Sequence, residues 1–282
     1  MNKSEKRLTT ISWFFISLSL FIWLFPIIWF ALASFKNPKN LYDIFSFEFS
    51  LYNYREVFNT YPIASYMKNS LILAISATLF AVTIGTLIAY GLSHTRFRFK
   101  TQTTVFIFLL RLIPGMAVMV PLFIIFSSLG LTNTYHGLIF AHTTMSIPLV
   151  VIIMLGYLSD FPKELLDAAY IDGCNKFNVI YLIVFPLIKP GLAVVAIFTF
   201  IGSWNNFDIA LILGYMPEYK TLPLGLAGMG NRYGILWHHV AAAGAVYIIP
   251  TVIMAITLSK YVISGLTVGA ICLTKGDIGY LT

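Results

Sequence analysis

The sequence predicts an all-α polytopic membrane protein with six transmembrane helices, and composition and patterning carry this prediction. Of the 282 residues, 59% are hydrophobic and 10% are charged, whereas a soluble domain carries about 25% charged residues. The apolar residues form continuous runs of about 20 residues, the length of a helix that crosses a bilayer. These runs do not alternate polar and apolar residues, which excludes an outer-membrane barrel. The composition also excludes a soluble enzyme, a disulfide scaffold and a disordered chain.

Six hydrophobic stretches are the predicted spans: Ile11–Ala33, Met67–Leu92, Val105–Ser127, Gly137–Tyr157, Gly191–Leu213 and Val240–Leu266. The first stretch follows Lys3, Lys6 and Arg7 and ends on Ala31-Leu32-Ala33, which resembles a signal peptide. Its 23 residues are long for a signal-peptide core of about 7–15. We therefore expect a retained anchor helix. The predicted parts are a tail 1–10, the anchor 11–33, an outer loop 34–66, a five-helix core 67–266 and a tail 267–282.

Basic residues predict the orientation, because lysines and arginines concentrate in cytoplasmic loops. With the N-terminus inside, the inner pieces hold Lys3, Lys6, Arg7, Arg96, Arg98, Lys100, Lys163, Lys176, Lys189, Lys260 and Lys275. The outer pieces hold Lys36, Lys39, Arg55, Lys68, Lys220 and Arg232, and Arg111 lies within a span. The inner pieces thus hold eleven basic residues and the outer pieces six. This difference predicts that both termini and the long segment 158–190 are cytoplasmic. The net charge of +7 is explained in the same way and does not require nucleic acid as a partner.

The predicted spans contain a row of small residues and several prolines. Small residues recur every fourth position on one helix face, at Ala77, Ala81, Gly85 and Ala89. Such a face lets a second helix approach closely, so we expect a packed helix interface there. Proline removes a backbone hydrogen bond and favours a kink, and the prolines within spans are Pro26, Pro114, Pro121, Pro148 and Pro250.

The inner segment 158–190 predicts a short amphipathic helix at the membrane surface. Ser159 or Asp160 is a suitable N-cap ahead of Pro162. Gly173 is a suitable left-handed C-cap, which leaves about eleven helical residues. Four positions share one face of this helix, namely Leu165, Ala168, Ala169 and Asp172. The two alanines make that face smooth, so it either enters a cleft on a partner or rests on the membrane without one.

The same segment resembles the EAA loop of bacterial ATP-binding-cassette (ABC) importer permeases. That loop reads Glu-Ala-Ala, three residues, Gly, nine residues, Ile, one residue, Leu-Pro. Here Asp167-Ala168-Ala169, Gly173, Ile183 and Phe185-Pro186 occupy these positions. The sequence departs from the pattern at Asp167, which replaces Glu, and at Phe185, which replaces Leu. Both replacements keep the acidic or apolar character.

Further motifs are similar to those of the carbohydrate branch of that family, the class of the maltose permease G-type subunit. They are Leu51-Tyr52-Asn53-Tyr54, Asn69-Ser70, Ala89-Tyr90, Arg111 with Pro114 and Pro121, Asp172-Gly173, Ser203-Trp204-Asn205-Asn206-Phe207 and Gly265–Ala270. The resemblance covers roughly residues 10–270. Beyond it, Ile-Cys-Leu-Thr precedes Lys275-Gly276, where the family usually ends on Gly-Ala-Val-Lys-Gly. The chain therefore departs from the family pattern at its C-terminal tail.

The resemblance implies the ABC importer type I permease fold in the bacterial cytoplasmic (inner) membrane. It implies an extracytoplasmic solute-binding protein that delivers a sugar, a second homologous permease subunit and two ATPase subunits or domains. ATP and Mg would be bound by the ATPase, and this chain would bind no cofactor and catalyse no reaction. The residues implied in coupling to the ATPase are Glu164, Asp167, Ala168, Ala169, Asp172, Gly173, Ile183 and Pro186.

Candidate sites inside the membrane are few. Asp208 is an acid within a predicted span, where charge is costly, and Asn205 and Asn206 lie within one turn of it. These residues either line a polar translocation path or form a structural hydrogen-bond cluster, which could include Arg111. A second function, an ion- or proton-coupled carrier, would use Asp208 and Arg111 as its coupling pair. The chain has no Gly-x-x-x-x-Gly-Lys-[Ser/Thr] motif for ATP. Its histidines are scattered, and adjacent His238 and His239 should point apart on a helix, so no metal site is expected.

Overall fold

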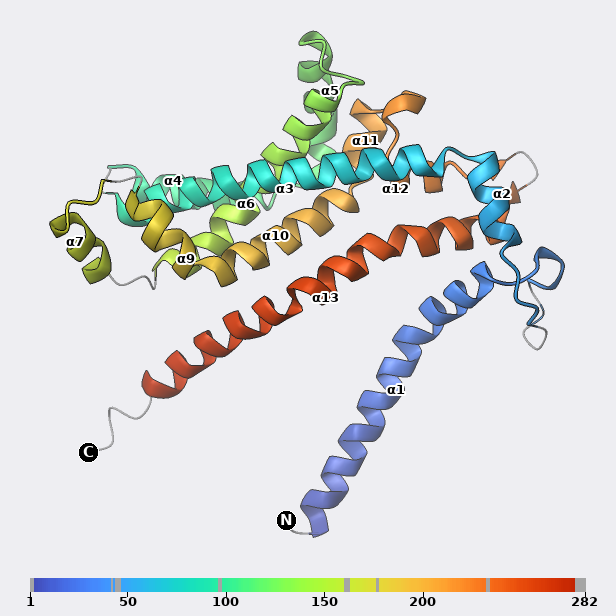
Figure 1. Ribbon diagram of the computed structural model, residues 1–282, viewed down its shortest axis with the longest axis horizontal. Helices are drawn as coiled ribbons and strands as arrows, with labels where there is room; N and C mark the ends of the chain where they lie inside the picture. The colour runs from blue at the N-terminus through green and yellow to red at the C-terminus, as the bar shows by residue number, and fades with distance from the viewer. Residues whose placement is uncertain are drawn as a thin grey trace. The chain divides into compact units, whose positions relative to one another are not determined.

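The computed structural model describes residues 3–41, 43, 47–95, 98–159, 163–175, 178–231 and 234–276 (Figure 1). Its α-helices are α1 Lys3–Ser34, α2 Tyr52–Thr60, α3 Ile63–His94, α4 Lys100–Leu110, α5 Gly115–Ser128, α6 Tyr135–Ser159, α7 Lys163–Ile171, α9 Phe185–Leu187, α10 Lys189–Trp204, α11 Asp208–Leu213, α12 Leu222–Ala227 and α13 Trp237–Gly276. Shorter elements are the 3₁₀ turns η1 Pro38–Asn40 and η3 Pro217–Tyr219, the π-helix η2 Val179–Val184 and the antiparallel strands β1 Gly230–Asn231 and β2 Gly234–Ile235.

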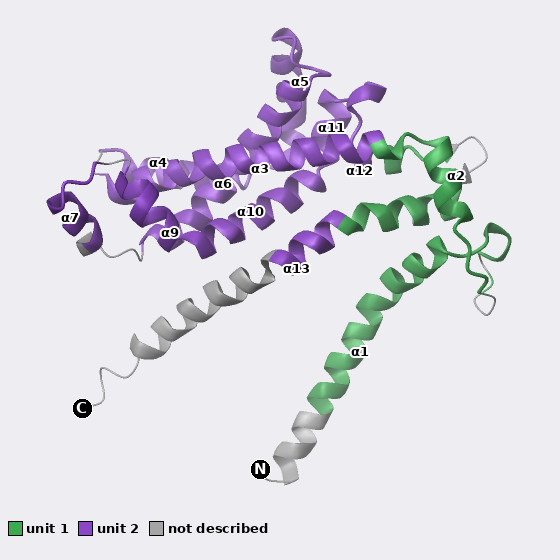
Figure 2. Ribbon diagram, in the orientation of Figure 1, with its two compact units in different colours: residues 1–64, 225–249 green, residues 65–224, 250–282 purple. Residues whose placement is uncertain are grey.

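The chain divides into two compact units (Figure 2). The first contains residues 1–64 and 225–249, and the second contains residues 65–224 and 250–282. Unit 1 therefore holds α1, α2 and the start of α13, and unit 2 holds most of α3 together with α4 to α11.

The predicted fold class is confirmed: the protein is a mostly helical, polytopic membrane protein. Four helices of the described chain are long and apolar enough to cross a membrane, namely Ile11–Ser34, Ile63–His94, Tyr135–Ser159 and Trp237–Thr257. Two further helix pairs meet the same condition together but are bent, Lys100–Leu110 with Gly115–Ser128 by 99° and Val179–Leu187 with Lys189–Trp204 by 75°. The number of crossings reaches six if each bent pair is one span.

The third predicted span, Val105–Ser127, is not one straight helix. Helix α4 ends before Arg111, and α5 starts after Pro114, whose ψ of 129° is not helical. Proline has no N–H to donate, and it disfavours the helical conformation of the residue before it. The chain therefore turns between Arg111 and Pro114. The other prolines within predicted spans lie inside helices, at Pro26, Pro121, Pro148 and Pro250.

The fifth predicted span, Gly191–Leu213, is also divided. Helix α10 ends at Trp204, and the short helix α11 begins at Asp208. Between them the Asn206 side-chain oxygen accepts a hydrogen bond from the Ile209 N–H at 2.9 Å. This bond supplies an acceptor for a free N–H at the start of α11, and such side-chain bonds compete with a continuous helix.

Close packing of α3 on α6 organises the core of unit 2. The predicted stripe of small residues is fully buried at Ala77, Ala81 and Ala89. At Gly85 an added Cβ would lie 2.7 Å from Cγ1 of Val150 on α6, so only glycine allows this approach. Helix α6 also packs on α10, where a Cβ at Gly191 would meet the Tyr157 ring at 2.7 Å.

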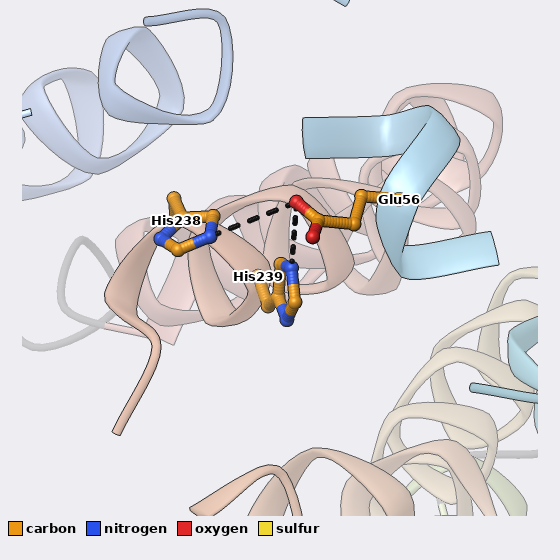
Figure 3. Close-up of side chains that lie close together, drawn as sticks. All are labelled: Glu56, His238 and His239. Atoms are coloured by element: carbon orange, nitrogen blue, oxygen red, sulfur yellow. Dashed lines mark ion pairs between the residues drawn. The ribbon is translucent and has the colours of Figure 1, made fainter. Parts of the chain in front are cut away.

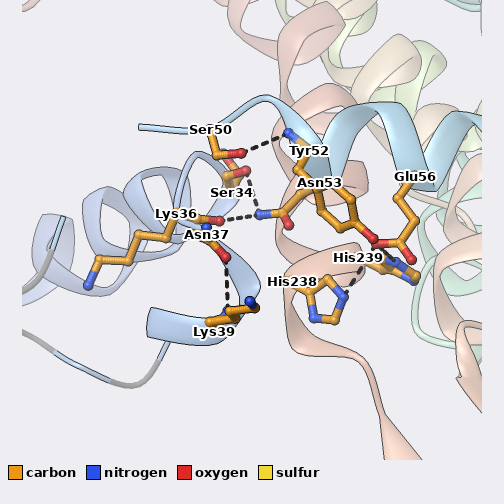
Figure 4. Close-up of polar contacts among 10 residues, drawn as sticks. All are labelled: Ser34, Lys36, Asn37, Lys39, Ser50, Tyr52, Asn53, Glu56, His238 and His239. Atoms are coloured by element: carbon orange, nitrogen blue, oxygen red, sulfur yellow. Dashed lines mark hydrogen bonds and ion pairs between the residues drawn. The ribbon is translucent and has the colours of Figure 1, made fainter. Parts of the chain in front are cut away.

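In unit 1 a buried asparagine fastens α2 to the end of α1. The Asn53 side-chain N–H₂ group donates hydrogen bonds to the carbonyl oxygens of Ser34 at 3.0 Å and Lys36 at 2.8 Å (Figure 4). The Tyr54 hydroxyl forms a 2.8 Å hydrogen bond with the Ser34 hydroxyl. Because the last carbonyls of a helix have no partner within it, these bonds stabilise the C-terminus of α1. The motif Leu51-Tyr52-Asn53-Tyr54 thus has a structural role in this chain.

Gly85→Ala should destabilise the protein, whereas Gly91→Ala on the same helix should not. The new methyl at position 85 clashes with Val150, and overpacking of this kind costs about 1–3 kcal/mol. No atom lies within 4 Å of a Cβ at position 91, so there the change should stabilise α3 by up to about 1 kcal/mol. Thermal unfolding of the two purified variants measures the difference, and equal midpoints would show that the α3–α6 contact is not tight.

Candidate functional site

Helix α7 of the inner segment has a complete C-terminal cap. Gly173 has a φ of +83°, which confirms the left-handed backbone predicted for it. The Cys174 N–H donates to the Ala169 carbonyl at 3.0 Å, and the Gly173 N–H donates to the Tyr170 carbonyl at 3.1 Å. This pair of hydrogen bonds is the Schellman motif, and it needs a residue that tolerates positive φ. The helix therefore ends at a fixed place and the chain leaves it in a fixed direction.

The predicted start of α7 falls partly outside the described residues. The helix has nine residues and begins at Lys163. Ser159 does not cap it, because this residue ends α6 and its hydroxyl donates to the Leu155 carbonyl at 2.7 Å. Asp160 and Pro162 lie outside the described residues, as do the side chains of Glu164 and Asp167.

One face of α7 is packed into unit 2. Leu166 and Ala169 are buried in a hydrophobic cluster that also contains Val179 and Val184 and residues of α3 and α6. The Tyr170 side chain interacts with that of Tyr90 near the end of α3. The prediction that Ala168 and Ala169 together form a free smooth surface is therefore wrong for Ala169. It lies three residues after Leu166, so both side chains face the core.

The other face of α7 remains exposed. It presents Leu165, Ala168, Ile171 and Asp172, and the Ile171 side chain is 85% exposed. This is the highest exposure of any large hydrophobic side chain among those described. The exposed face of α7 thus combines the apolar side chains of Leu165 and Ile171 with the acidic side chain of Asp172.

The rest of the inner segment connects α7 to the next long helix through a sharp bend. The chain forms the π-helix η2, in which Ile183 is partly buried against the same cluster. Pro186 lies in α9 and is exposed, and Pro190 opens α10. The helix axis turns by 75° between Val179–Leu187 and Lys189–Trp204. The positions of the predicted motif thus form one packed unit of α7, η2 and α9.

The candidate path residues lie at the break between α10 and α11. Asp208 is half-buried in the first turn of α11, where a negative charge is favourable near the helix N-terminus. Asn205 is the exposed C-cap of α10, and the side-chain oxygen of Asn206 accepts a hydrogen bond from the Ile209 N–H. Arg111 is exposed after the end of α4, and no ion pair joins it to Asp208 in the described chain. The structure therefore does not bring together the two residues that a lone carrier would couple.

A group of buried polar side chains between α6 and α10 was not predicted from the sequence. His142 on α6 forms a 2.9 Å hydrogen bond through Nδ1 with the Ser203 hydroxyl on α10. The His142 Nε2 and the hydroxyls of Thr143 and Thr199 are buried without hydrogen-bond partners. In the sequence His142 is followed by Thr143 and Thr144, and its pairing with Ser203, the first residue of the Ser-Trp-Asn motif, is seen only in the folded chain.

Asn69 and Ser70 have a structural role that the sequence did not reveal. The Asn69 side chain donates to the carbonyl oxygens of Glu218 at 2.8 Å and Lys220 at 2.9 Å. The Ser70 hydroxyl accepts from the Leu222 N–H at 2.8 Å. Two adjacent residues at the start of α3 therefore hold the segment after α11 in place.

In unit 1 the two adjacent histidines do not point apart as predicted. Their ring centroids are 4.4 Å apart, and both rings face Glu56 of α2 (Figure 3). They lie in the first turn of α13, and Glu56 comes from a segment far away in the sequence. Only the folded chain could reveal this cluster.

The chain matches the family model of the binding-protein-dependent transport system inner membrane component over residues 81–268. It is 36% identical to the trehalose/maltose transport system permease protein MalG of Thermococcus litoralis, over 91% of this chain and 93% of that one. It is 33% identical to the arabinooligosaccharides transport system permease protein AraQ of Bacillus subtilis, over 92% of this chain and 93% of that one.

Solved structures show the same fold. A crystal structure of a bacterial ABC transporter involved in the import of the acidic polysaccharide alginate matches with a TM-score of 0.82 at 20% identity, over 93% of this chain and 99% of that one. A second one, in complex with an alginate pentasaccharide-bound periplasmic protein, matches with a TM-score of 0.67 at 18% identity, over 91% and 94%. The resemblance seen in the EAA loop is therefore confirmed, and the chain belongs to the family of binding-protein-dependent transport system inner membrane components, as a permease subunit of an ABC importer.

Proposed function

We propose that this permease subunit translocates a carbohydrate delivered by an extracytoplasmic solute-binding protein. ATP hydrolysis on two partner ATPase subunits or domains drives the transport, and a second, homologous permease subunit completes the path. The names of the relatives support the sugar class, because MalG and AraQ are both permeases of saccharide transport systems. ATP and Mg are bound by the partner ATPase.

The observation that carries the coupling role is the packing of α7. Its buried face, at Leu166 and Ala169, joins the same hydrophobic cluster as α3 and α6. Its outer face offers Ile171 and Asp172. A push by an ATPase on this outer face is therefore transmitted to the long helices, because a close-packed interior moves as a unit and does not absorb the displacement.

The path role of Asp208 rests on its position. It lies where the chain breaks between α10 and α11, beside the exposed Asn205. Broken helices inside a membrane occur where the irregular backbone lines a cavity or is buried in protein. At such a break a carboxylate can accept hydrogen bonds from sugar hydroxyls, and a side-chain amide can both accept hydrogen bonds from them and donate hydrogen bonds to them.

Gly173→Val should uncouple ATP hydrolysis from transport, whereas Gly173→Asn should retain much of the coupling. No atom lies within 4 Å of an added Cβ, so the effect arises from the backbone, whose positive φ costs a residue with a Cβ about 1–2 kcal/mol. Asparagine tolerates this conformation better than valine. The measurement is ATPase activity in reconstituted vesicles, with and without the loaded solute-binding protein. Normal stimulation of Gly173→Val would contradict the coupling role.

Asp208→Asn should lower sugar uptake at least severalfold while the complex still assembles. The substitution keeps the size of the side chain and removes its charge. Glu218→Gln is the matched control, because Glu218 is an exposed acid outside the break. Uptake into vesicles measures a role of Asp208 in the translocation path, and the yield of intact complex measures a structural role. A failure to assemble would assign it a structural role, and unchanged uptake would remove it from the path.

The orientation can be tested at Cys174, since we infer that α7 and both termini face the cytoplasm. In a Cys272→Ser background, an impermeant thiol reagent should label the half-buried Cys174 only after the membrane is opened. Labelling after denaturation provides the control for accessibility. Labelling in sealed cells would place α7 on the outer side and would reverse the topology.

A further inference from the structure

Three side chains of unit 1 converge from two distant segments to form a compact cluster. The Glu56 Oε2 atom lies 3.1 Å from Nε2 of His239 and 3.8 Å from Nε2 of His238. One ligand atom from each residue can be chosen so that all three atoms lie within 4.8 Å of one another. Figure 3 shows both imidazole rings turned toward the same carboxylate.

The cluster contains buried polar atoms that the protein leaves without hydrogen bonds. The His239 side chain is 3% exposed, its Nδ1 has no hydrogen-bond partner, and its Nε2 lies 3.1 Å from Oε2 of Glu56 without forming a hydrogen bond with it. Burying such atoms without partners is unfavourable. A cation between the three side chains would give Nε2 of His239 and Oε2 of Glu56 a ligand bond at the same time.

The donor set selects the class of cation. Two imidazole nitrogens and one carboxylate oxygen are ligands of Zn²⁺ and of neighbouring first-row transition metals. Mg²⁺ and Ca²⁺ prefer a shell of oxygen atoms. Tetrahedral Zn²⁺ with bonds of about 2.0–2.2 Å holds its ligands roughly 3.3–3.6 Å apart. The observed separations of 3.1 and 3.8 Å from the carboxylate oxygen lie on either side of that range.

The surroundings hold the ligands in place and leave one side open. The Tyr61 ring packs edge-on against His239 with the centroids 5.8 Å apart. Glu56 lies one helical turn after Asn53, which is fastened to the end of α1 (Figure 4). The side chains of His238 and Glu56 are 17% and 34% exposed, so a water molecule can supply a fourth ligand.

We propose that Glu56, His238 and His239 form a binding site for a divalent transition metal of the Zn²⁺ class. The metal would join α2 to the first turn of α13 within unit 1. Because it would bind the folded state and require neutral imidazoles, it would raise the stability of this unit and would bind less tightly at acidic pH.

The test is a zinc titration of the full chain in the detergent-solubilised complex with which it copurifies. The affinity tag must contain no histidine, and the complex is first stripped with a chelator. Wild type is compared with Glu56→Gln, His239→Gln and, as the matched control, His136→Gln, an exposed histidine of α6. X-ray absorption at the zinc edge reports the ligands, and Mg²⁺ serves as the control cation.

We expect one zinc ion per chain in wild type and in His136→Gln, with imidazole scattering in the absorption spectrum and a higher unfolding temperature. Glu56→Gln and His239→Gln should lose this ion, with affinity reduced at least tenfold. Zinc binding that is the same in all four proteins would overturn the proposal, as would a wild type that binds none. If wild type binds no zinc, Glu56 and the two histidines form an ion pair only. Intact assembly of Glu56→Gln shows that the loss of zinc is not due to unfolding.

Discussion

The close approach of α3 to α6 is the constraint on which unit 2 depends. It exists because Gly85 has no side chain and Ala81 and Ala89 have short ones along one face of α3. In a bilayer the solvent offers no hydrophobic drive to bring helices together, so contact between their surfaces must provide the attraction. The cluster built on this contact includes Leu166 and Ala169 of α7. The position of the proposed coupling helix is therefore set by the core.

Breaks in the helices are as important here as the helices themselves. The chain turns at Pro114, at the junction of α9 with α10 and at Asn205–Phe207. Each break frees backbone groups that must find other partners in a membrane. At the last of these, Asn206 bonds to the N–H of Ile209. This hydrogen bond stabilises the break at which Asp208 lies. The break can therefore hold a polar side chain.

Several buried polar side chains in the described part of the chain join one segment to another. Asn53 holds the end of α1, Asn69 and Ser70 hold the segment after α11, and His142 bonds to Ser203 across α6 and α10. In each case a side chain bonds to groups far away in the sequence. Such bonds gain strength in a medium of low dielectric constant, and they specify which segments lie together.

The sequence by itself determined the class of the protein, its apolar spans, the stripe of small residues and the cap at Gly173. These features follow from local rules: the length of a helix that crosses a bilayer, the period of a helix and the left-handed backbone that glycine tolerates. The motif spacing from Asp167 to Pro186 also indicated the family, because it depends only on the order of residues along the chain. The bend at Pro114 could be anticipated as a kink, but its angle depends on the helices packed around it.

Only the tertiary structure decided which face of α7 is free, that Arg111 and Asp208 do not pair, and that Glu56 meets His238 and His239. Ala168 and Ala169 are indistinguishable by helical periodicity, and the difference arises because Leu166 and Ala169 face a core built from other helices. Adjacent histidines normally diverge on a helix. Here both rings turn toward one carboxylate that α2 brings from a distant part of the sequence. Local rules cannot supply such contacts, because they depend on where the chain places segments that are far apart along it.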